Sequence, residues 1–186
     1  RDWSSDVCSS DLQRTLLPVM LEWFSESPDP DAALLGFRRV SESLGQTPWY
    51  LRLLRDESAT AERLANLLGS SRYATDLLLR SPESVALLAD GGGLEPRPVA
   101  DLLTEAGAIN ARTDDAGDAV VSLRAMRRRE LLRIAAGALT GAAPTQAVGE
   151  ALAAVTDATI HGAVEALRAA DNQAPPFVVI AMGRYG

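Results

Sequence analysis

The chain has 186 residues, of which 47% are hydrophobic, 23% are charged and only 5% are aromatic. This composition is typical of a globular protein whose core is built mainly from Leu, Ala and Val. The formal net charge of −7 argues against nucleic-acid binding, which needs a basic surface. No apolar stretch approaches the roughly 20 residues of a membrane span, so we expect no membrane contact. We also expect a cytoplasmic location.

The first twelve residues stand apart from the rest of the chain. Residues 2–12, DWSSDVCSSDL, match letter for letter the translation of a sequencing-library adapter. We therefore leave residues 1–12 out of the fold prediction, as an unstructured segment. The alternative is a natural tail rich in Ser and Asp. The only cysteine, Cys8, lies in this segment, so it supports no disulfide, metal or nucleophile argument.

A succession of helices is predicted for the first half of the chain. Apolar residues recur at helical spacing over 13–25, 30–44, 49–55, 60–68, 73–80 and 82–88. A capping residue followed by proline, at Asp29-Pro30 and again at Thr47-Pro48, marks two helix starts. Ser71 is a further candidate N-cap.

The second half is predicted to contain one short helix and two long ones. After the glycine- and proline-rich residues 90–98, the spacing predicts a helix over 99–106. Residues 108–117 read as a surface loop or a weak continuation of that helix. Apolar residues at a period near 3.6 then predict helices over 119–139 and 144–170. Because the connection between them is short, these two helices should pack as an antiparallel pair.

The last ten residues differ from the helices. Residues 177–182, FVVIAM, form an apolar run between two prolines and a glycine, which predicts one buried β-strand entering a tight loop. A single strand has no partner for its backbone groups. The sequence therefore predicts an all-α fold: a multi-helix bundle over 13–173, followed over 174–186 by the first strand and glycine loop of a truncated domain.

A short glycine loop, Gly183-Arg184-Tyr185-Gly186, follows the predicted strand directly. Glycines after a buried strand let backbone N–H groups approach phosphate oxygens closely, although ordinary turns use the same residues. The loop is not a P-loop, because no Gly-Lys-Ser/Thr follows, and no helix or acidic residue follows to complete a dinucleotide fingerprint. Gly183 and Gly186 are the candidate nucleotide-binding residues, and Arg184 is a weaker one.

Two further groups have a structural as well as a functional interpretation. His161, the only histidine, lies four residues after Asp157 on one helix face. Without a cysteine or an acidic cluster beside it, His161 indicates no metal site, and we expect an exposed or half-buried structural histidine. Trp23, Trp49 and Tyr50 could form a ligand box, but at helical spacing among leucines they are expected in the core.

Arginines gather in one predicted helix, at Arg124, Arg127, Arg128, Arg129 and Arg133. Their guanidinium groups suit phosphate or carboxylate partners. Two roles stay open on these grounds: ion pairs within the molecule, with Glu130 among the partners, or contact with a nucleotide or another protein.

The C-terminal stretch FVVIAMGRYG resembles the opening of the nucleotidyltransferase domain in the glutamine synthetase adenylyltransferase family, also called glutamate–ammonia-ligase adenylyltransferase. In that family the strand and an AMG[KR]xG motif precede a further glycine, an acidic residue and an SDxD motif. Upstream blocks resemble the actinobacterial version of the family: PDPDAALLGFRRVSESLGQTPWYLRLLRDE at 28–57, SSRYATDLLLRSPE at 70–83 and RRRELLRIAA at 127–136. The resemblance extends from about residue 13 to the end.

The resemblance implies an enzyme with two halves, each with a helical region and a polymerase-β-like nucleotidyltransferase domain. One half transfers AMP from ATP to a tyrosine of glutamine synthetase, and the other removes it by phosphorolysis. The TPWYLRLLRDE and SSRY blocks resemble the segment ahead of the second, adenylylating domain. Glutamine synthetase and a PII-type regulatory protein are the implied partners.

ATP and Mg²⁺ are the cofactors that the resemblance implies for the whole enzyme. The carboxylates that hold Mg²⁺ belong to the SDxD motif, which would follow Gly186. We therefore expect no catalytic or metal-binding residue in this chain, and no activity from it alone. The alternative is a free-standing helical interaction module that binds glutamine synthetase or a regulatory protein.

Overall fold

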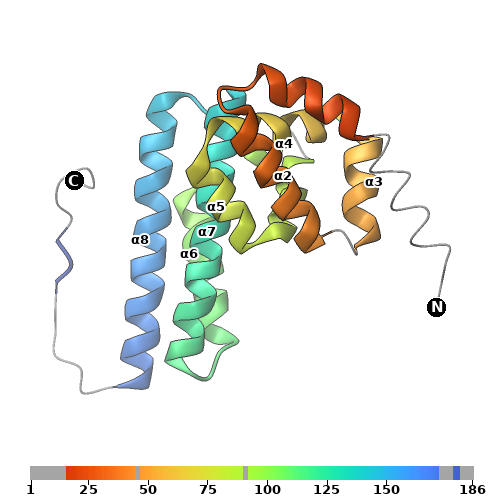
Figure 1. Ribbon diagram of the computed structural model, residues 1–186. Coiled ribbons are helices and arrows are strands. Elements are labelled where there is room, and N and C mark those ends of the chain that lie inside the picture. The colour runs from red at the N-terminus through yellow and green to blue at the C-terminus, as the bar shows by residue number, and fades with distance from the viewer. Residues whose placement is uncertain (1–15, 45–46, 90–91, 172–177, 181–186) are drawn as a thin grey trace, which may run out of the picture. The chain divides into compact units, whose positions relative to one another are not determined.

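The computed structural model describes residues 16–44, 47–89, 92–171 and 178–180 (Figure 1). Within these ranges all regular structure is helical and no residue belongs to a strand, which confirms the predicted all-α class. None of the described helices has the length and apolar character needed to cross a membrane. The chain divides into two compact units, Arg1–Glu95 with Leu131–Pro144, and Pro96–Glu130 with Thr145–Gly186.

The first unit consists of helices joined by short connections. In chain order they are a helix at residues 16–26, α2 (Pro30–Leu44), α3 (Pro48–Asp56), α4 (Ser58–Ser70), α5 (Arg72–Arg80), and the 3₁₀ helices η1 (Pro82–Leu88) and η2 (Gly92–Leu94). The last part of α7 (Ala116–Thr140) completes the unit. The segment predicted at 82–88 is thus helical, but it forms the tighter 3₁₀ type.

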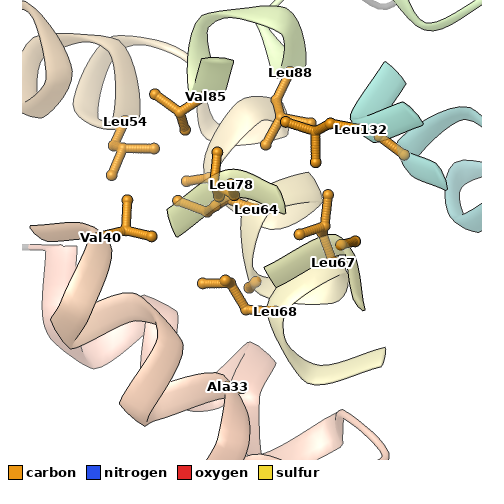
Figure 2. Packing of buried hydrophobic residues seen from close by; sticks show 14 of the residues in the cluster. Ala33, Val40, Leu54, Leu64, Leu67, Leu68, Leu78, Val85, Leu88 and Leu132 are labelled. Carbon is orange, nitrogen blue, oxygen red and sulfur yellow. The ribbon is translucent and has the colours of Figure 1, made fainter. Parts of the chain in front are cut away.

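Helix α4 is the centre of this unit, since it packs against α2, α3, α5 and η1. Its apolar face is buried over two turns, with Leu64, Leu67 and Leu68 each at most 1% exposed. Figure 2 shows these leucines surrounded by side chains from the neighbouring elements, among them Val40, Leu54, Leu78, Val85, Leu88 and Leu132. Each such leucine stabilises the unit by roughly 1.5–3 kcal/mol relative to an exposed one.

Two of the three predicted caps are formed. The Asp29 carboxylate accepts a hydrogen bond from the Ala32 amide at 3.1 Å, and the Ser71 hydroxyl accepts one from the Ala74 amide at 3.2 Å. Thr47 precedes α3 as predicted but makes no side-chain cap. Its hydroxyl instead donates to the carbonyl of Leu44, closing the preceding helix end.

The second unit is built from α6 (Val99–Ala111), the first part of α7, and α8 (Thr145–Ala170). Helix α6 packs along α8. The helix predicted over 99–106 is present, and of the two alternatives for residues 108–117 the continuation holds as far as Ala111, where α6 ends. The helix continues because Ile109 extends the buried face that Leu102 and Ala106 begin.

Small residues let the helices of this unit approach one another closely. A Cβ atom at Gly162 of α8 would lie 2.8 Å from Cδ2 of Leu123 and 3.1 Å from Cβ of Ala106. Gly162 is therefore the point at which α6, α7 and α8 meet. The predicted contact between the two long helices is present there, but α6 as a partner of α8 was not predicted.

Only the middle of the predicted C-terminal strand is described. Residues 178–180 have no regular secondary structure, and their side chains are exposed, with Val178 at 84% and Ile180 at 76%. Residues 177, 181 and 182 lie outside the described residues. The strand therefore stays a prediction.

Candidate functional site

The glycine loop that carries the predicted nucleotide-binding residues, Gly183, Arg184 and Gly186, lies outside the described residues. The described part of the chain holds no group of three or more His, Cys, Asp or Glu side chains that could bind a metal ion. His161 is exposed on α8, as expected of a structural histidine. The described residues therefore do not supply a ligand set for Mg²⁺.

The aromatic residues are mainly part of the core. Tyr50 is completely buried, and Trp23 packs against the core of the first unit. Burial raises the pKa of the Tyr50 hydroxyl to about 12 even though it shares a hydrogen bond with Ser41. Trp49 was wrongly predicted to be buried, because it is 39% exposed, one helical step around α3 from Tyr50. The three do not form a ligand box.

The arginine-rich stretch of α7 forms an ion cluster in the second unit, which we call the α6–α7 ion cluster: Arg97, Glu105, Arg129 and Glu130. Glu105 of α6 receives two hydrogen bonds of 2.6 Å, one from Nη1 of Arg97 and one from Nη2 of Arg129. Glu130 of α7 lies 3.1 Å from Nη1 of Arg97 and 3.4 Å from Nε of Arg129. The two guanidinium groups thus join the two carboxylates.

Burial and charge explain why the cluster holds together. The Glu130 side chain is only 1% exposed, whereas those of Arg97 and Arg129 are 26% and 37% exposed. A buried carboxylate needs a paired cation to stay charged. Partial burial alone would raise the pKa of Glu105, but the hydrogen bonds from Arg97 and Arg129 outweigh it and lower the pKa below its ordinary value.

Part of the arginine stretch therefore serves intramolecular ion pairs, one of the two roles that the sequence left open. Arg133 adds a further internal contact in the first unit, where its guanidinium donates to the backbone carbonyl of Gly93. Sequence reasoning named Glu130 as a partner but missed Arg97 and Glu105. Little in the sequence indicated that these two residues take part in the cluster. Arg97 stands between two prolines, and Glu105 lies on a predicted helix whose packing partner was unknown.

A comparison with protein families gives a match over residues 61–186 to the model described as glutamate-ammonia ligase adenylyltransferase. The match covers more than half of the chain. The chain belongs to the glutamate-ammonia ligase adenylyltransferase family. The matched range includes the α6–α7 ion cluster and the C-terminal glycine loop, so both are features of a member of this family.

Similar proteins from several organisms carry the name bifunctional glutamine synthetase adenylyltransferase/adenylyl-removing enzyme. That from Streptomyces coelicolor is 49% identical over 94% of the chain and 19% of its own length. Those from Leifsonia xyli and Mycobacterium tuberculosis H37Rv are 49% and 40% identical, again over 94% of the chain and 18% of their own length. The chain thus spans about a fifth of these adenylyltransferases. No solved structure matches the chain.

Proposed function

We propose that the chain is a section of an enzyme that transfers AMP from ATP to a tyrosine of glutamine synthetase, and that removes it by phosphorolysis through its other half. Such an enzyme would regulate nitrogen assimilation in the cytoplasm. The observation that carries this proposal is the family match over residues 61–186. The names of the relatives, at 40–49% identity, support both activities.

Within that enzyme, residues 13–173 would form the helical region ahead of the second, adenylylating domain. Residues 177–182 would then be the first strand of that domain, and Gly183 and Gly186 would lie against the phosphates of ATP. The exposure of Val178 and Ile180 is consistent with this assignment, because apolar side chains of a strand become buried when another layer of a domain packs on the face of its sheet.

ATP and Mg²⁺ would be the cofactors of the whole enzyme, and glutamine synthetase and a PII-type regulatory protein its partners. When bound, Mg²⁺ would neutralise charge on the triphosphate. Because the described residues offer no metal-binding cluster, we assign no metal ligand and no catalytic residue to this chain. Its proposed contribution is the glycine loop and the helices that support it.

The test is a transfer assay with glutamine synthetase, Mg²⁺ and ATP labelled at the α-phosphate. We expect no label on glutamine synthetase with the 186-residue chain, and label with a longer protein that continues through an SDxD motif. Transfer by the chain alone would contradict the assignment of its residues. Failure of the longer protein to transfer AMP would contradict the enzymatic function. In that longer protein, Gly183→Val should raise the KM for ATP.

A second candidate function is a free-standing helical module that binds glutamine synthetase or a regulatory protein. The all-helical structure of the described residues favours it. Calorimetric titration of the 186-residue chain with purified glutamine synthetase is the deciding measurement. Saturable binding together with an inactive longer protein would support the module over the enzyme.

A further inference from the structure

The first unit contains a cavity of about 410 Å³ that is open to solvent between α2 and α5, and we call it the α2–α5 groove. One wall comes from residues four apart on α2. The other comes from two adjacent residues of α5 and a third that lies three to four positions further on, so each wall is one helix face. These residues are Asp31, Leu35 and Arg39 of α2, and Thr75, Asp76 and Leu79 of α5. The volume is in the range of ligand-binding clefts.

A glycine and an ion pair shape the groove. A Cβ atom at Gly36 would lie 3.1 Å from Cδ2 of Leu68 and 3.2 Å from Cγ2 of Thr75, so the glycine lets α2 pack directly on α4 and α5. At the end where both helices begin, Nη2 of Arg72 lies 3.0 Å from Oδ2 of Asp29. Hydrogen bonds from Arg72 and from the Ala32 amide lower the pKa of Asp29, so this pair stays ionised.

The other charges of the groove have no such partner. The side chains of Asp31, Asp76 and Arg39 form no hydrogen bond or ion pair with any residue that the structure describes. Between them Leu35 is 47% exposed, so an apolar surface is open beside two free carboxylates and one free guanidinium. The groove thus combines a short apolar wall with charged groups that a ligand of complementary charge can pair with.

We propose that the α2–α5 groove binds an arginine or lysine side chain of a partner protein. The aliphatic stem of that side chain would lie on Leu35 and Leu79, and its cation would lie between Asp31 and Asp76. Long basic side chains pack in this way, with the stem on apolar surface and the charge at its edge. Two free carboxylates against one free guanidinium favour a cation over an anion.

Arg39 favours a polypeptide over a free amine as the source of the cation. A guanidinium group has five N–H donors and no acceptor, so Arg39 can pair only with an acceptor of the occupant, such as a carbonyl or a carboxylate. A basic residue in a polypeptide brings a backbone carbonyl at the other end of its aliphatic stem, where Arg39 can donate to it, whereas a polyamine brings only donors. The open groove also leaves one side of the occupant free, which suits a side chain presented by a larger surface.

The test is an NMR titration of the ¹⁵N-labelled 186-residue chain with the peptide acetyl-Ala-Arg-Ala-amide. We expect saturable shifts of the backbone amides of Gly36 and Thr75. The neutral citrulline peptide should bind at least about fivefold more weakly, because it keeps the shape but loses the charge. Equal binding of the citrulline peptide, or tighter binding of a glutamate peptide, would overturn the proposal. Putrescine binding as tightly as the arginine peptide would overturn the assignment to a protein partner.

Two variants locate the binding. Asp76→Asn removes one free carboxylate from an exposed helix position and should weaken binding of the arginine peptide roughly two- to fivefold, the range of an exposed ion pair. Asp157→Asn is the matched control, because Asp157 is also exposed in the middle of a helix, α8, and does not line the groove. It should leave the affinity unchanged. Equal losses in both variants would show that net charge, and not the groove, governs binding.

Discussion

Arg97 and Glu130 are 33 residues apart in sequence, yet Nη1 of Arg97 lies 3.1 Å from Oε1 of Glu130. Arg97 stands just before α6, and Glu130 lies in α7 at the last position that belongs to the second unit. The Glu130 side chain is almost completely buried, and Arg97 and the neighbouring Arg129 are cations that contact its carboxylate. The pair thus anchors the start of α6 to α7.

Replacing Glu130 with glutamine should destabilise the protein. Glu130→Gln keeps the shape but removes the buried charge that Arg97 and Arg129 face, so we expect a loss of about 1–3 kcal/mol in the free energy of unfolding. Both arginines are partly exposed, which keeps the expected loss below that of a completely buried pair. Urea denaturation at neutral pH measures it.

The control for this variant is Glu165→Gln in α8. Glu165 pairs with Arg168 at 3.3 Å, and both side chains are about half exposed. Exposed pairs of this kind contribute about 0–1 kcal/mol, so the control should unfold close to the wild type. A Glu130→Gln loss no larger than that of the control would contradict the anchoring role.

The α6–α7 ion cluster should also make stability depend on acidic pH through Glu105. The pKa of Glu105 is lowered in the folded protein, so folding favours its ionised form. The stabilisation that comes from ionised Glu105 is complete above its unfolded-state pKa of about 4.5. It is lost as the pH falls through the lowered folded-state pKa. Glu105→Gln should therefore be less stable than the wild type at neutral pH, and the gap should close in acid.

Urea denaturation of both proteins between about pH 7 and pH 3 checks this dependence. The readout is the difference between the two free energies of unfolding, since the carboxylates outside the α6–α7 ion cluster titrate in both proteins alike. A difference that stays constant over the whole range would show that the arginines do not lower the pKa of Glu105.

Local signals in the sequence predicted most of the helices correctly. The caps at Asp29 and Ser71 form as expected, because a capping side chain and its amide partner are only three residues apart. The sequence left the end of α6 open between a loop and a continued helix, because this end depends on packing between helices and not on neighbours in the chain. Gly107 lies inside that helix, and burial of Ile109 against neighbouring helices outweighs the low helix propensity of glycine.

The ion pairs of the α6–α7 ion cluster were likewise only partly predictable from the sequence. The sequence identified the arginines and the adjacent Glu130, whose proximity is local. It could not pair Arg129 with Glu105, 24 residues away, because that contact depends on how α6 packs on α7. For Gly183 and Gly186, which lie outside the described residues, the family resemblance is still the basis of the assignment.

Close packing at Gly162 leads to a prediction that a matched glycine in the same helix can check. Gly162→Ala places a Cβ atom against Leu123 and Ala106, and only the leucine end can move aside. Overpacking of this kind typically costs about 1–3 kcal/mol, which exceeds the gain of about 1 kcal/mol in helix propensity. We expect lower stability in thermal and urea unfolding.

Gly149→Ala in α8 is the control for that substitution. A Cβ atom at Gly149 meets no other atom within 4 Å, so only the propensity gain applies. The variant should be more stable than the wild type by up to about 1 kcal/mol. Opposite signs at the two glycines are expected, and stabilisation at both would mean that the three helices do not meet at Gly162.

The start of α5 offers a test of a single cap. Ser71→Ala removes the hydroxyl that accepts the Ala74 amide at 3.2 Å, which should cost about 0.5–2 kcal/mol in the free energy of unfolding. Ser58→Ala is the matched control, because Ser58 is exposed at the first residue of α4 and is not its cap. It should change stability by less than about 0.5 kcal/mol.

Amide hydrogen exchange adds a local readout: in Ser71→Ala the first turn of α5 should exchange faster, while the first turn of α4 keeps its wild-type rate. Unchanged exchange at Ala74 would show that the Ser71 hydroxyl does not hold this helix end.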